Sequence, residues 1–354
     1  MHVIITGATG NLGTATVRRL RAGTADVTVD ALSRRVPAAD PPPGVRWRQV
    51  DVRTDPLVER FRGADAVVHL AWRFQPTRDP VSTWRTNVLG SLRVFEAAAA
   101  AGVGCLVHLS SVGAYTPGPP GDAPVDETWP THALPTAAYG QQKSYLERAL
   151  DAWEQRAPEL RVVRLRPAFV FQRAAASEQR RLFAGPFLPH PLVRPRWVPV
   201  VPDVPGLSFQ VVHADDVAAA IVSVIHGDAR GAFNLAADPP LTTADVAELL
   251  GARTVRVSPS VLRRATGVLW RAHLIPASPG LVALVTSLPL LDTARARREL
   301  GWSPSKGAHA TLAGHLEAIA AGAAGPTPPL APRAGGAARW QELTSGVGAR
   351  DPVP

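Results

Sequence analysis

Cysteine, lysine and tyrosine are scarce in this 354-residue chain, and each shortage is informative. The single cysteine, Cys105, excludes an intrachain disulfide. No cluster of His, Cys, Asp and Glu has the spacing of metal ligands, so we expect no metal. The 38 basic residues include only two lysines, Lys143 and Lys306. The chain has only three tyrosines, Tyr115, Tyr139 and Tyr145.

Long apolar runs are also missing. The most apolar late segment, Leu274 to Leu291, is interrupted by three prolines and is too short to span a bilayer. The chain opens on Met1–Gly7, which predicts a buried strand rather than the charged and apolar regions of a signal peptide. We therefore expect a cytoplasmic protein with no membrane partner.

The basic residues are not concentrated in runs. The net charge is +9 and the calculated pI is about 10.9. Arginines are nevertheless scattered along the chain, and the few aromatic residues do not alternate with them, so the pattern argues against a nucleic-acid partner. A hydrophobic content of 46% and a charged content of 19% are typical of a folded protein with a sizeable core.

Short apolar runs alternate with amphipathic stretches over the first 170 residues. This pattern predicts an α/β fold with a Rossmann-like, doubly wound parallel sheet, because strands covered on both faces are apolar throughout. We expect helices after the first strand, over residues 82–101 and from about Ala137 to Glu154. The strands are expected at His2–Thr6, Val27–Ser33, Arg46–Val50, Ala66–Leu70, Leu106–Ser110 and Arg161–Leu165.

The composition changes after Phe171. Residues 172–207 are rich in Pro and Arg and show no clear periodicity. Beyond them we expect strands at Phe209–Val212 and Gly231–Leu235, and helices at Asp215–Ile225, 241–252 and 293–301. Residues 321–354 are rich in Ala, Gly and Pro, which predicts a tail that is flexible or lies on the surface.

A glycine-rich loop follows the first expected strand. In Thr6-Gly7-Ala8-Thr9-Gly10-Asn11-Leu12-Gly13, Gly7 permits a tight turn, Gly10 lets a pyrophosphate approach the backbone, and Gly13 lets the next helix pack close to the sheet. The N-terminus of that helix offers unpaired N–H groups to phosphate. The loop therefore predicts a dinucleotide site.

The end of the second strand bears on the choice of cofactor. NAD-binding proteins place an acid there, about 20 residues after the glycines, to bind the ribose 2′-hydroxyl. This chain has Ser33, Arg34 and Arg35 instead, and Asp30 comes three residues too early. A hydroxyl and guanidinium groups suit a 2′-phosphate, so we favour NADP over NAD.

A tyrosine and a lysine share one face of a predicted helix. Tyr139 and Lys143 are four residues apart, and a nearby ammonium group favours the phenolate and would lower the phenol pKa. Ser111, at the end of the fifth strand, could donate a hydrogen bond to a substrate oxygen. Keeping one of two lysines here, in a chain that otherwise uses arginine, favours a catalytic pair.

Together these motifs resemble the extended short-chain dehydrogenase/reductases, the NAD(P)-dependent epimerase/dehydratase family, over about residues 1–320. Besides the glycine loop, the matching segments are Asp51-Val52, His69-Leu70-Ala71, Asn87-Val88 with Gly90, Ser110-Ser111 with Tyr115, Tyr139 to Lys143, Arg166-Pro167 with Val170, His213 to Ala218, and Leu300-Gly301-Trp302. The resemblance implies catalytic roles for Ser111, Tyr139 and Lys143. It implies cofactor contacts from the glycine loop (Gly7, Gly10, Asn11, Leu12, Gly13) and from Asp51, Val52, Leu70, Ala71, Asn87, Tyr139, Lys143, Pro167 and Val170.

The resemblance also implies a domain organisation. Residues 1–171 and 208–240 would form the cofactor-binding core, and residues 172–207 and 241–320 a smaller, largely C-terminal substrate-binding lobe. Members of the family are often dimers through the two helices at 82–101 and 137–154, so a homodimer is expected.

Three residues depart from the family pattern near the expected substrate site. Phe169 replaces an Asn that is frequent in members acting on nucleotide sugars, Gln172 replaces a Gly, and Trp72 stands where a small residue is frequent. We expect Trp72, Ser111 and Phe169 to contact a small-molecule substrate in a more apolar pocket.

Three functions remain open at this point. The first is an oxidoreductase that transfers a hydride at a carbonyl or alcohol carbon of a small organic substrate, with Tyr139 as acid–base. The second is an epimerase or dehydratase of a nucleotide sugar that reduces its NAD only transiently. The third is a non-catalytic dinucleotide-binding sensor, which the presence of Ser111, Tyr139 and Lys143 disfavours.

Overall fold

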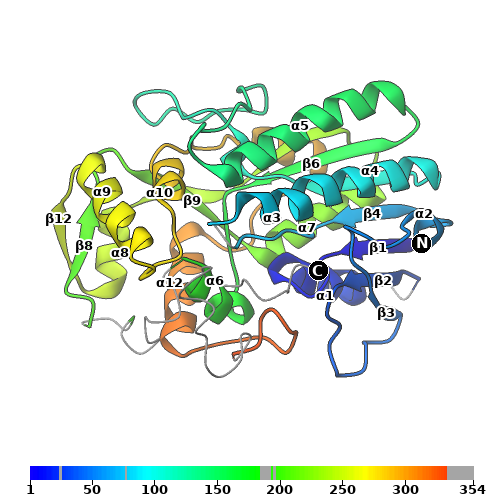
Figure 1. Ribbon diagram of the computed structural model, residues 1–354, viewed down its shortest axis with the longest axis horizontal. Coiled ribbons are helices and arrows are strands. Elements are labelled where there is room, and N and C mark those ends of the chain that lie inside the picture. The colour runs from blue at the N-terminus through cyan, green and yellow to red at the C-terminus, as the bar shows by residue number, and fades with distance from the viewer. Residues whose placement is uncertain (24–25, 76–77, 184–192, 194–196, 333–354) are drawn as a thin grey trace.

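A seven-stranded parallel sheet forms the centre of the protein (Figure 1). The computed structural model describes residues 1–332 apart from 24–25, 76–77, 184–192 and 194–196. The strand order is β10-β6-β5-β4-β1-β2-β3, and every pair is parallel. The strands are β1 (His2–Thr6), β2 (Thr28–Ser33), β3 (Val45–Gln49), β4 (Ala66–His69), β5 (Cys105–Leu109), β6 (Arg161–Pro167) and β10 (Gly231–Leu235).

Helices cover both faces of this sheet (Figure 1). One face carries α1 (Asn11–Gly23), α7 (Ala214–His226) and α11 (Ala294–Leu300); the other carries α2 (Val58–Phe61), α4 (Gly90–Ala100) and α5 (Ala138–Arg156). Because side chains alternate along a strand, Val3 and Ile5 are buried against the first set and Ile4 against the second. The predicted doubly wound fold is therefore confirmed.

The expected helix over 82–101 is divided into three parts. They are α3 (Pro80–Trp84), the π-helical segment η1 (Arg85–Leu89) and α4. Asp79 caps α3 by accepting a hydrogen bond from the Ser82 backbone N–H at 2.9 Å. A π-helical turn is a local insertion that the helical spacing of apolar residues does not reveal.

A smaller set of elements lies at the far end of the molecule from β2 and β3 (Figure 1). One three-stranded sheet consists of β7 (Phe169–Phe171), β9 (Ser208–His213) and β11 (Ala237–Thr242), and a two-stranded sheet consists of β8 (Val200–Asp203) and β12 (Arg253–Arg256). The helices of this region are α6 (Ala176–Phe183), α8 (Thr243–Leu250), α9 (Pro259–Arg271), α10 (Pro279–Val285) and α12 (Ala308–Ala320). Short 3-10 turns lie at η2 (Val112–Ala114) and η3 (Arg173–Ala175).

The segment after α12 packs against the core. Leu330 is fully buried and Thr327 is 4% exposed, so residues 323–331 form an ordered strap, here named the C-terminal strap. The remainder of the predicted tail, residues 333–354, lies outside the described residues. No described helix is long and apolar enough to cross a membrane.

Candidate active site

The glycine loop follows β1 and opens α1, as its sequence predicts. A Cβ atom on Gly7, whose φ is +71°, would lie 2.7 Å from the Ala71 Cα, and one on Gly13 would lie 2.3 Å from the Gly7 carbonyl oxygen. Gly10 is different, because its only described neighbour within 4 Å of such an atom is that same carbonyl, at 3.4 Å. The loop thus packs tightly at Gly7 and Gly13 and leaves open space beside Gly10 for a ligand.

Two cavities meet at this loop and form one cleft along the carboxyl ends of the strands. Gly7, Gly10, Leu70, Trp72 and Glu178 line both of them. The first, of about 150 Å³, is also lined by Ser33, Arg34, Arg35, Asp51, Val52 and Ala71. The second, of about 280 Å³, is also lined by Asn11, Leu12, Gly13, Ser111, Tyr139, Lys143, Pro167, Phe169 and Val170. The residues present therefore suit a dinucleotide, and the side chains predicted to be catalytic lie in the second cavity.

The first cavity ends at the arginine pair that follows β2. Ser33 donates a hydrogen bond to the Arg35 carbonyl oxygen at 2.9 Å, which fixes the turn. Asp30 is absent from the described lining, because its carboxylate accepts hydrogen bonds from Arg46 and lies within bonding distance of His2. Although burial acts to raise the Asp51 pKa, its hydrogen bonds and ion pair with Arg53 lower that pKa below the usual value.

The second cavity contains the expected catalytic side chains. Tyr139 lies in the first turn of α5, and its ring packs against Gly113, where an added Cβ would approach the ring to 2.9 Å. Ser111 lies two residues after the end of β5, and its Oγ accepts a hydrogen bond from the Gly113 N–H at 3.0 Å. Burial raises the pKa of the Tyr139 phenol, and a hydrogen bond with Ser111 opposes that rise. The hydrogen bond with Ser111 thus influences the protonation of the Tyr139 phenol.

The Tyr139 pKa is raised rather than lowered, contrary to the expectation from its spacing to Lys143. The Lys143 Nζ donates a hydrogen bond to the Leu109 carbonyl oxygen at 2.7 Å and lies 3.5 Å from the centre of the Trp72 ring. Burial lowers the Lys143 pKa to about 7, and the negative charge of Glu147 opposes that shift. In this dry environment, desolvation outweighs the effect that spacing on one helix face predicts.

Aromatic side chains surround the Tyr139 phenol. The centres of the Trp72 and Phe74 rings lie 5.6 and 5.2 Å from the centre of the Tyr139 ring, and Phe183 contacts Phe74. The Trp72 Nε1 is buried and has no hydrogen-bond partner in the part of the chain that the structure describes. The remaining wall is apolar and comes from α6, α10 and the segment after α10, through Leu182, Leu281, Leu284, Val285 and Leu288.

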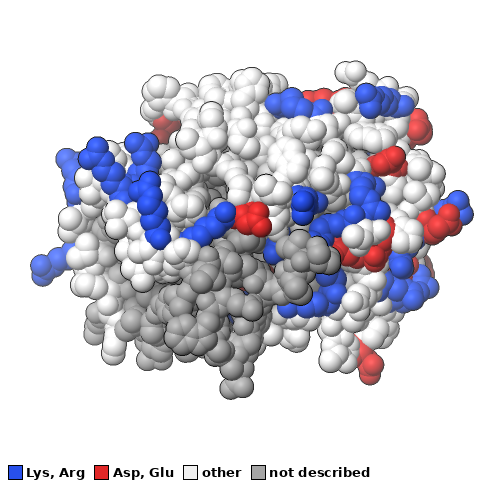
Figure 2. Space-filling model, in the orientation of Figure 1, with Lys and Arg blue, Asp and Glu red and all other residues white. Residues whose placement is uncertain are grey.

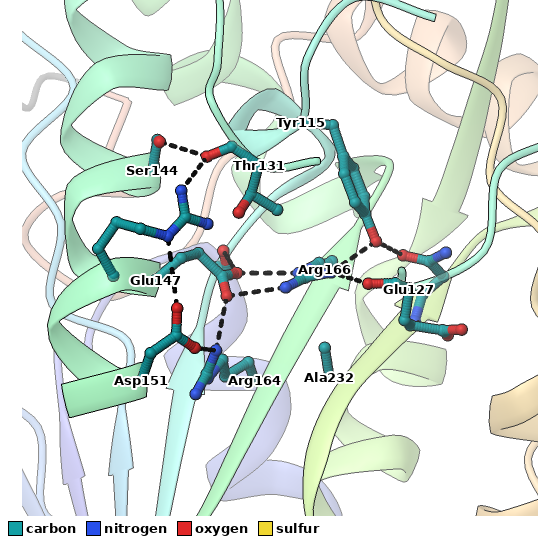
Figure 3. Close-up of polar contacts among 12 residues, drawn as sticks. Tyr115, Glu127, Thr131, Ser144, Glu147, Asp151, Arg164, Arg166 and Ala232 are labelled. Atoms are coloured by element: carbon teal, nitrogen blue, oxygen red, sulfur yellow. Dashed lines mark hydrogen bonds and ion pairs between the residues drawn. The ribbon is translucent and has the colours of Figure 1, made fainter. Parts of the chain in front are cut away.

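A buried polar network surrounds Glu147 and Arg166 (Figure 3). Glu147, one turn beyond Lys143 on α5, is fully buried and binds Arg166 through two hydrogen bonds of 2.9 Å. It also accepts a hydrogen bond of 2.5 Å from Ser110. Arg166 in turn donates to the Tyr115 hydroxyl at 2.8 Å. Burial acts to raise the Glu147 pKa, but these partners and Arg164 together lower it to about 2, so Glu147 is ionised. Through its hydrogen bonds Glu147 connects α5 to the ends of β5 and β6.

Asn87 differs from the other predicted cofactor residues. Its amide is fully engaged with the Arg73 backbone, at 2.7 and 2.8 Å, and with Gln142, at 2.8 Å. It is 1% exposed and is not part of the described cavity lining. In this arrangement Asn87 fixes the loop after β4 against α5. The expected direct contact with the cofactor has no support in its position.

Sequence reasoning missed several lining residues. Phe74 and Glu178 are the clearest examples, because neither belongs to a motif and α6 showed no helical periodicity within a Pro- and Arg-rich segment. Pro329 also lines the first cavity, although it lies far along the chain in a region of low complexity. Only the fold brings these segments to the glycine loop.

The C-terminal strap is fastened to the glycine loop. The Thr327 hydroxyl donates to the Thr9 carbonyl oxygen at 2.7 Å, and Arg181 of α6 donates to the carbonyl oxygens of Pro329 and Ala331 at 3.0 and 3.1 Å. Both ends of the Thr327–Thr9 contact are buried. The strap therefore contributes Pro329 to the wall of the first cavity and fixes the conformation of the loop.

Replacing Thr327 with valine is expected to weaken dinucleotide affinity by about fivefold to tenfold, because it leaves the buried Thr9 carbonyl without its partner. Titration calorimetry with NADP and NAD measures the effect. Thr311→Val is the matched control, since Thr311 is equally buried and its hydroxyl has no described partner. Equal affinities in the two variants would contradict a role for the strap.

Comparison with known proteins agrees with this geometry. A family model described as the NAD dependent epimerase/dehydratase family matches residues 3–236. A UDP-glucose 4-epimerase of Rhizobium leguminosarum bv. trifolii is 32% identical over 148 residues, which cover 39% of this chain and 42% of the relative. An L-arabinose 1-dehydrogenase (NAD(P)(+)) of Haloferax volcanii is 38% identical over 111 residues, which cover 31% and 41%.

The two matches therefore span less than half the length of these relatives. Among solved structures, a UDP-glucose 4-epimerase of Thermus thermophilus in complex with NAD aligns with a TM-score of 0.65 at 23% identity. That alignment covers 90% of this chain and 99% of the other, and at this identity the likeness concerns the fold. The family model spans well over half of the chain, so this protein belongs to the NAD dependent epimerase/dehydratase family.

Proposed function

We propose that the protein is an NAD(P)-dependent oxidoreductase that acts on an alcohol or carbonyl group of a small organic substrate. The observation that carries this proposal is the position of Tyr139 and Ser111 on the same cleft as the glycine loop. A nicotinamide ring bound in the cleft would supply or accept the hydride. The sections of chain that build the cleft supply the acid–base group and the substrate pocket.

Each side chain has a distinct task in this proposal. Tyr139 gives a proton to the substrate oxygen during reduction or takes it during oxidation. Ser111 donates a hydrogen bond to the same oxygen as its charge develops. Lys143, held by the Leu109 carbonyl, has further protons with which to bind ribose hydroxyls. The aromatic and aliphatic walls exclude water from the reacting atoms.

The apolar walls favour an apolar substrate over a nucleotide sugar. Phe169 lies in the lining at the position where an amide would be needed to bind a diphosphate, and Trp72 and Phe74 contact Tyr139. The second candidate is a nucleotide-sugar epimerase or dehydratase. Two of the proteins compared above are named UDP-glucose 4-epimerase, which favours this candidate. Net cofactor consumption during turnover separates the two functions.

For the cofactor we propose a preference for NADP over NAD, since Ser33, Arg34 and Arg35 line the cavity and Asp30 does not. Calorimetry is expected to show at least about tenfold tighter binding of NADP, the ratio that one additional charge-assisted contact supports. An Arg35→Gln variant should narrow that ratio while Arg19→Gln, an exposed arginine on α1, should not. Tighter binding of NAD would overturn the preference and favour the epimerase or dehydratase. Absence of binding to both would overturn the whole proposal.

We also propose that two copies of the chain associate through α3, η1, α4 and α5. Val81, Leu89 and Tyr145 are 58%, 48% and 46% exposed there, an unusual amount of apolar surface for neighbouring helices. Light scattering should give twice the chain mass for the native protein, and the chain mass for Leu89→Arg. A monomeric native protein would contradict this proposal. The cytoplasmic location and the division into core and lobe stay predictions from sequence.

A further inference from the structure

An apolar stripe points outward from α9. Val261 and Val268 are 54% and 63% exposed, and Ala265 and Ala272 are exposed on the same face, at the spacing i, i+4, i+7 and i+11. Val255 on β12, Leu269 on α9 and Leu274 three residues after α9 add side chains that are 49%, 39% and 53% exposed. The opposite face of α9 carries its buried residues, Thr266 and Gly267. An amphipathic helix in a globular protein normally has the reverse orientation.

The same region is strongly basic. Between residues 249 and 291 the sequence contains no Asp or Glu. Five exposed arginines lie in it, Arg253, Arg256, Arg263, Arg264 and Arg271, and none has an ion pair with an acid among the described residues. Figure 2 shows basic side chains gathered over the end of the molecule that carries α9 and β12. We name residues 253–274 the basic–apolar surface.

We propose that the basic–apolar surface docks onto the surface of an anionic lipid bilayer. The apolar side chains would contact the acyl chains of such a bilayer, and the arginines beside them would contact its anionic headgroups. The stripe lies on the exposed face of a helix, which suits a flat partner. The expectation of no membrane partner from the sequence concerned bilayer-spanning segments and signal peptides, and only the fold shows that the apolar face of α9 points outward.

The location of this surface relates it to the catalytic cleft. α9 packs directly on α10, and Leu281 and Leu284 of α10 line the cavity that contains Tyr139. Docking through α9 would therefore bring an apolar cleft close to the lipid. The docking itself does not depend on the proposed reaction, so failure of one does not imply failure of the other.

Flotation of the full-length protein with lipid vesicles tests the proposal. Binding is expected on vesicles of phosphatidylcholine mixed with phosphatidylglycerol, and little on phosphatidylcholine alone. Arg264→Gln/Arg271→Gln should lower the partition coefficient by about an order of magnitude, and Val261→Ser/Val268→Ser by a similar factor. Arg19→Gln/Arg60→Gln removes the same charge from other exposed positions and should change the coefficient by less than about twofold.

Two results would overturn the docking proposal. One is a lack of binding to the mixed vesicles. If an acidic peptide such as polyglutamate then binds through the same arginines, the surface would be assigned to an acidic protein instead. The other is an equal loss of binding in the Arg19/Arg60 control, which would make the attraction a consequence of the overall charge. Dinucleotide affinity measured on every variant verifies that the fold is intact.

Discussion

Tyr139→Phe is expected to lower kcat by about 100-fold or more, the usual contribution of a positioned general acid–base. The substitution removes only the phenol oxygen, so the ring contacts with Trp72 and Phe74 and the packing on Gly113 should persist. Dinucleotide affinity should therefore stay within about twofold of the native value. Steady-state rates and calorimetry on the same preparation provide both readings.

Tyr145→Phe provides the matched control for this substitution. Tyr145 lies on the same helix, is 46% exposed and is separate from the described cleft lining. Its loss of a hydroxyl should leave kcat unchanged. Retention of more than about a tenth of the native rate in Tyr139→Phe would exclude the assigned acid–base role. If the native protein and the Tyr139→Phe variant both bind the cofactor but neither shows turnover, the result would favour the non-catalytic sensor.

The raised pKa of Tyr139 also predicts a pH dependence. Oxidation of an alcohol requires the phenolate as base, and burial raises the phenol pKa above its usual value of 10.0. The oxidation rate should therefore rise with pH across the neutral and mildly alkaline range. Carbonyl reduction requires the protonated phenol and should not rise. A rise that persists in Tyr139→Phe would assign this titration to another group.

The core of the site could be predicted because its signals are local in sequence. Strict steric requirements at Gly7 and Gly13 place glycine there, and each strand of the parallel sheet is a short apolar run whose end lies at the cleft. Ser111 follows β5 and Tyr139 lies in the first turn of α5, so the order of elements alone brings them to the same edge. For these positions, the pattern of elements determines the geometry.

The remaining parts of the site depend on contacts between distant segments. Thr327 lies 318 residues from Thr9, and nothing in a Pro- and Ala-rich segment indicates that a buried hydrogen bond forms there. The outward-pointing stripe on α9 has ordinary helical spacing, and only the packing shows which face is buried. Likewise the spacing of Tyr139 and Lys143 predicts a lowered Tyr139 pKa, but burial raises that pKa, and spacing alone does not reveal burial.

The second large effect is expected at Glu147. Glu147→Gln leaves the Arg166 guanidinium buried without the negative charge that pairs with it, and breaking a buried ion pair in this way typically costs about 3–5 kcal/mol of the free energy of unfolding. Denaturant titration of native and variant protein measures the loss. Glu154→Gln, on the same helix and with its carboxylate partly exposed to solvent, should cost much less.

Acid stability should change with the same substitution. The Glu147 pKa is about 2 in the folded protein, below its ordinary value of 4.5, so this carboxylate stabilises the fold above about pH 4.5 and loses that contribution as the pH falls toward 2. In Glu147→Gln this part of the acid transition should be missing. Glu147 also opposes the lowering of the Lys143 pKa, so the lysine should titrate below about 7 in the variant.

Replacing both partners distinguishes the loss of a charge pair from the loss of packing. Glu147→Leu/Arg166→Met removes this buried ion pair together and fills similar volume, while Arg164 keeps its ion pairs with Asp151 and Glu154. It should therefore recover most of the stability that Glu147→Gln loses. Turnover should not recover with it, because Lys143 still lacks the carboxylate that supports its charge and Ser110 lacks its acceptor. Recovery of both would reduce Glu147 to a structural role, whereas recovery of stability alone would make it a positioning residue for Lys143.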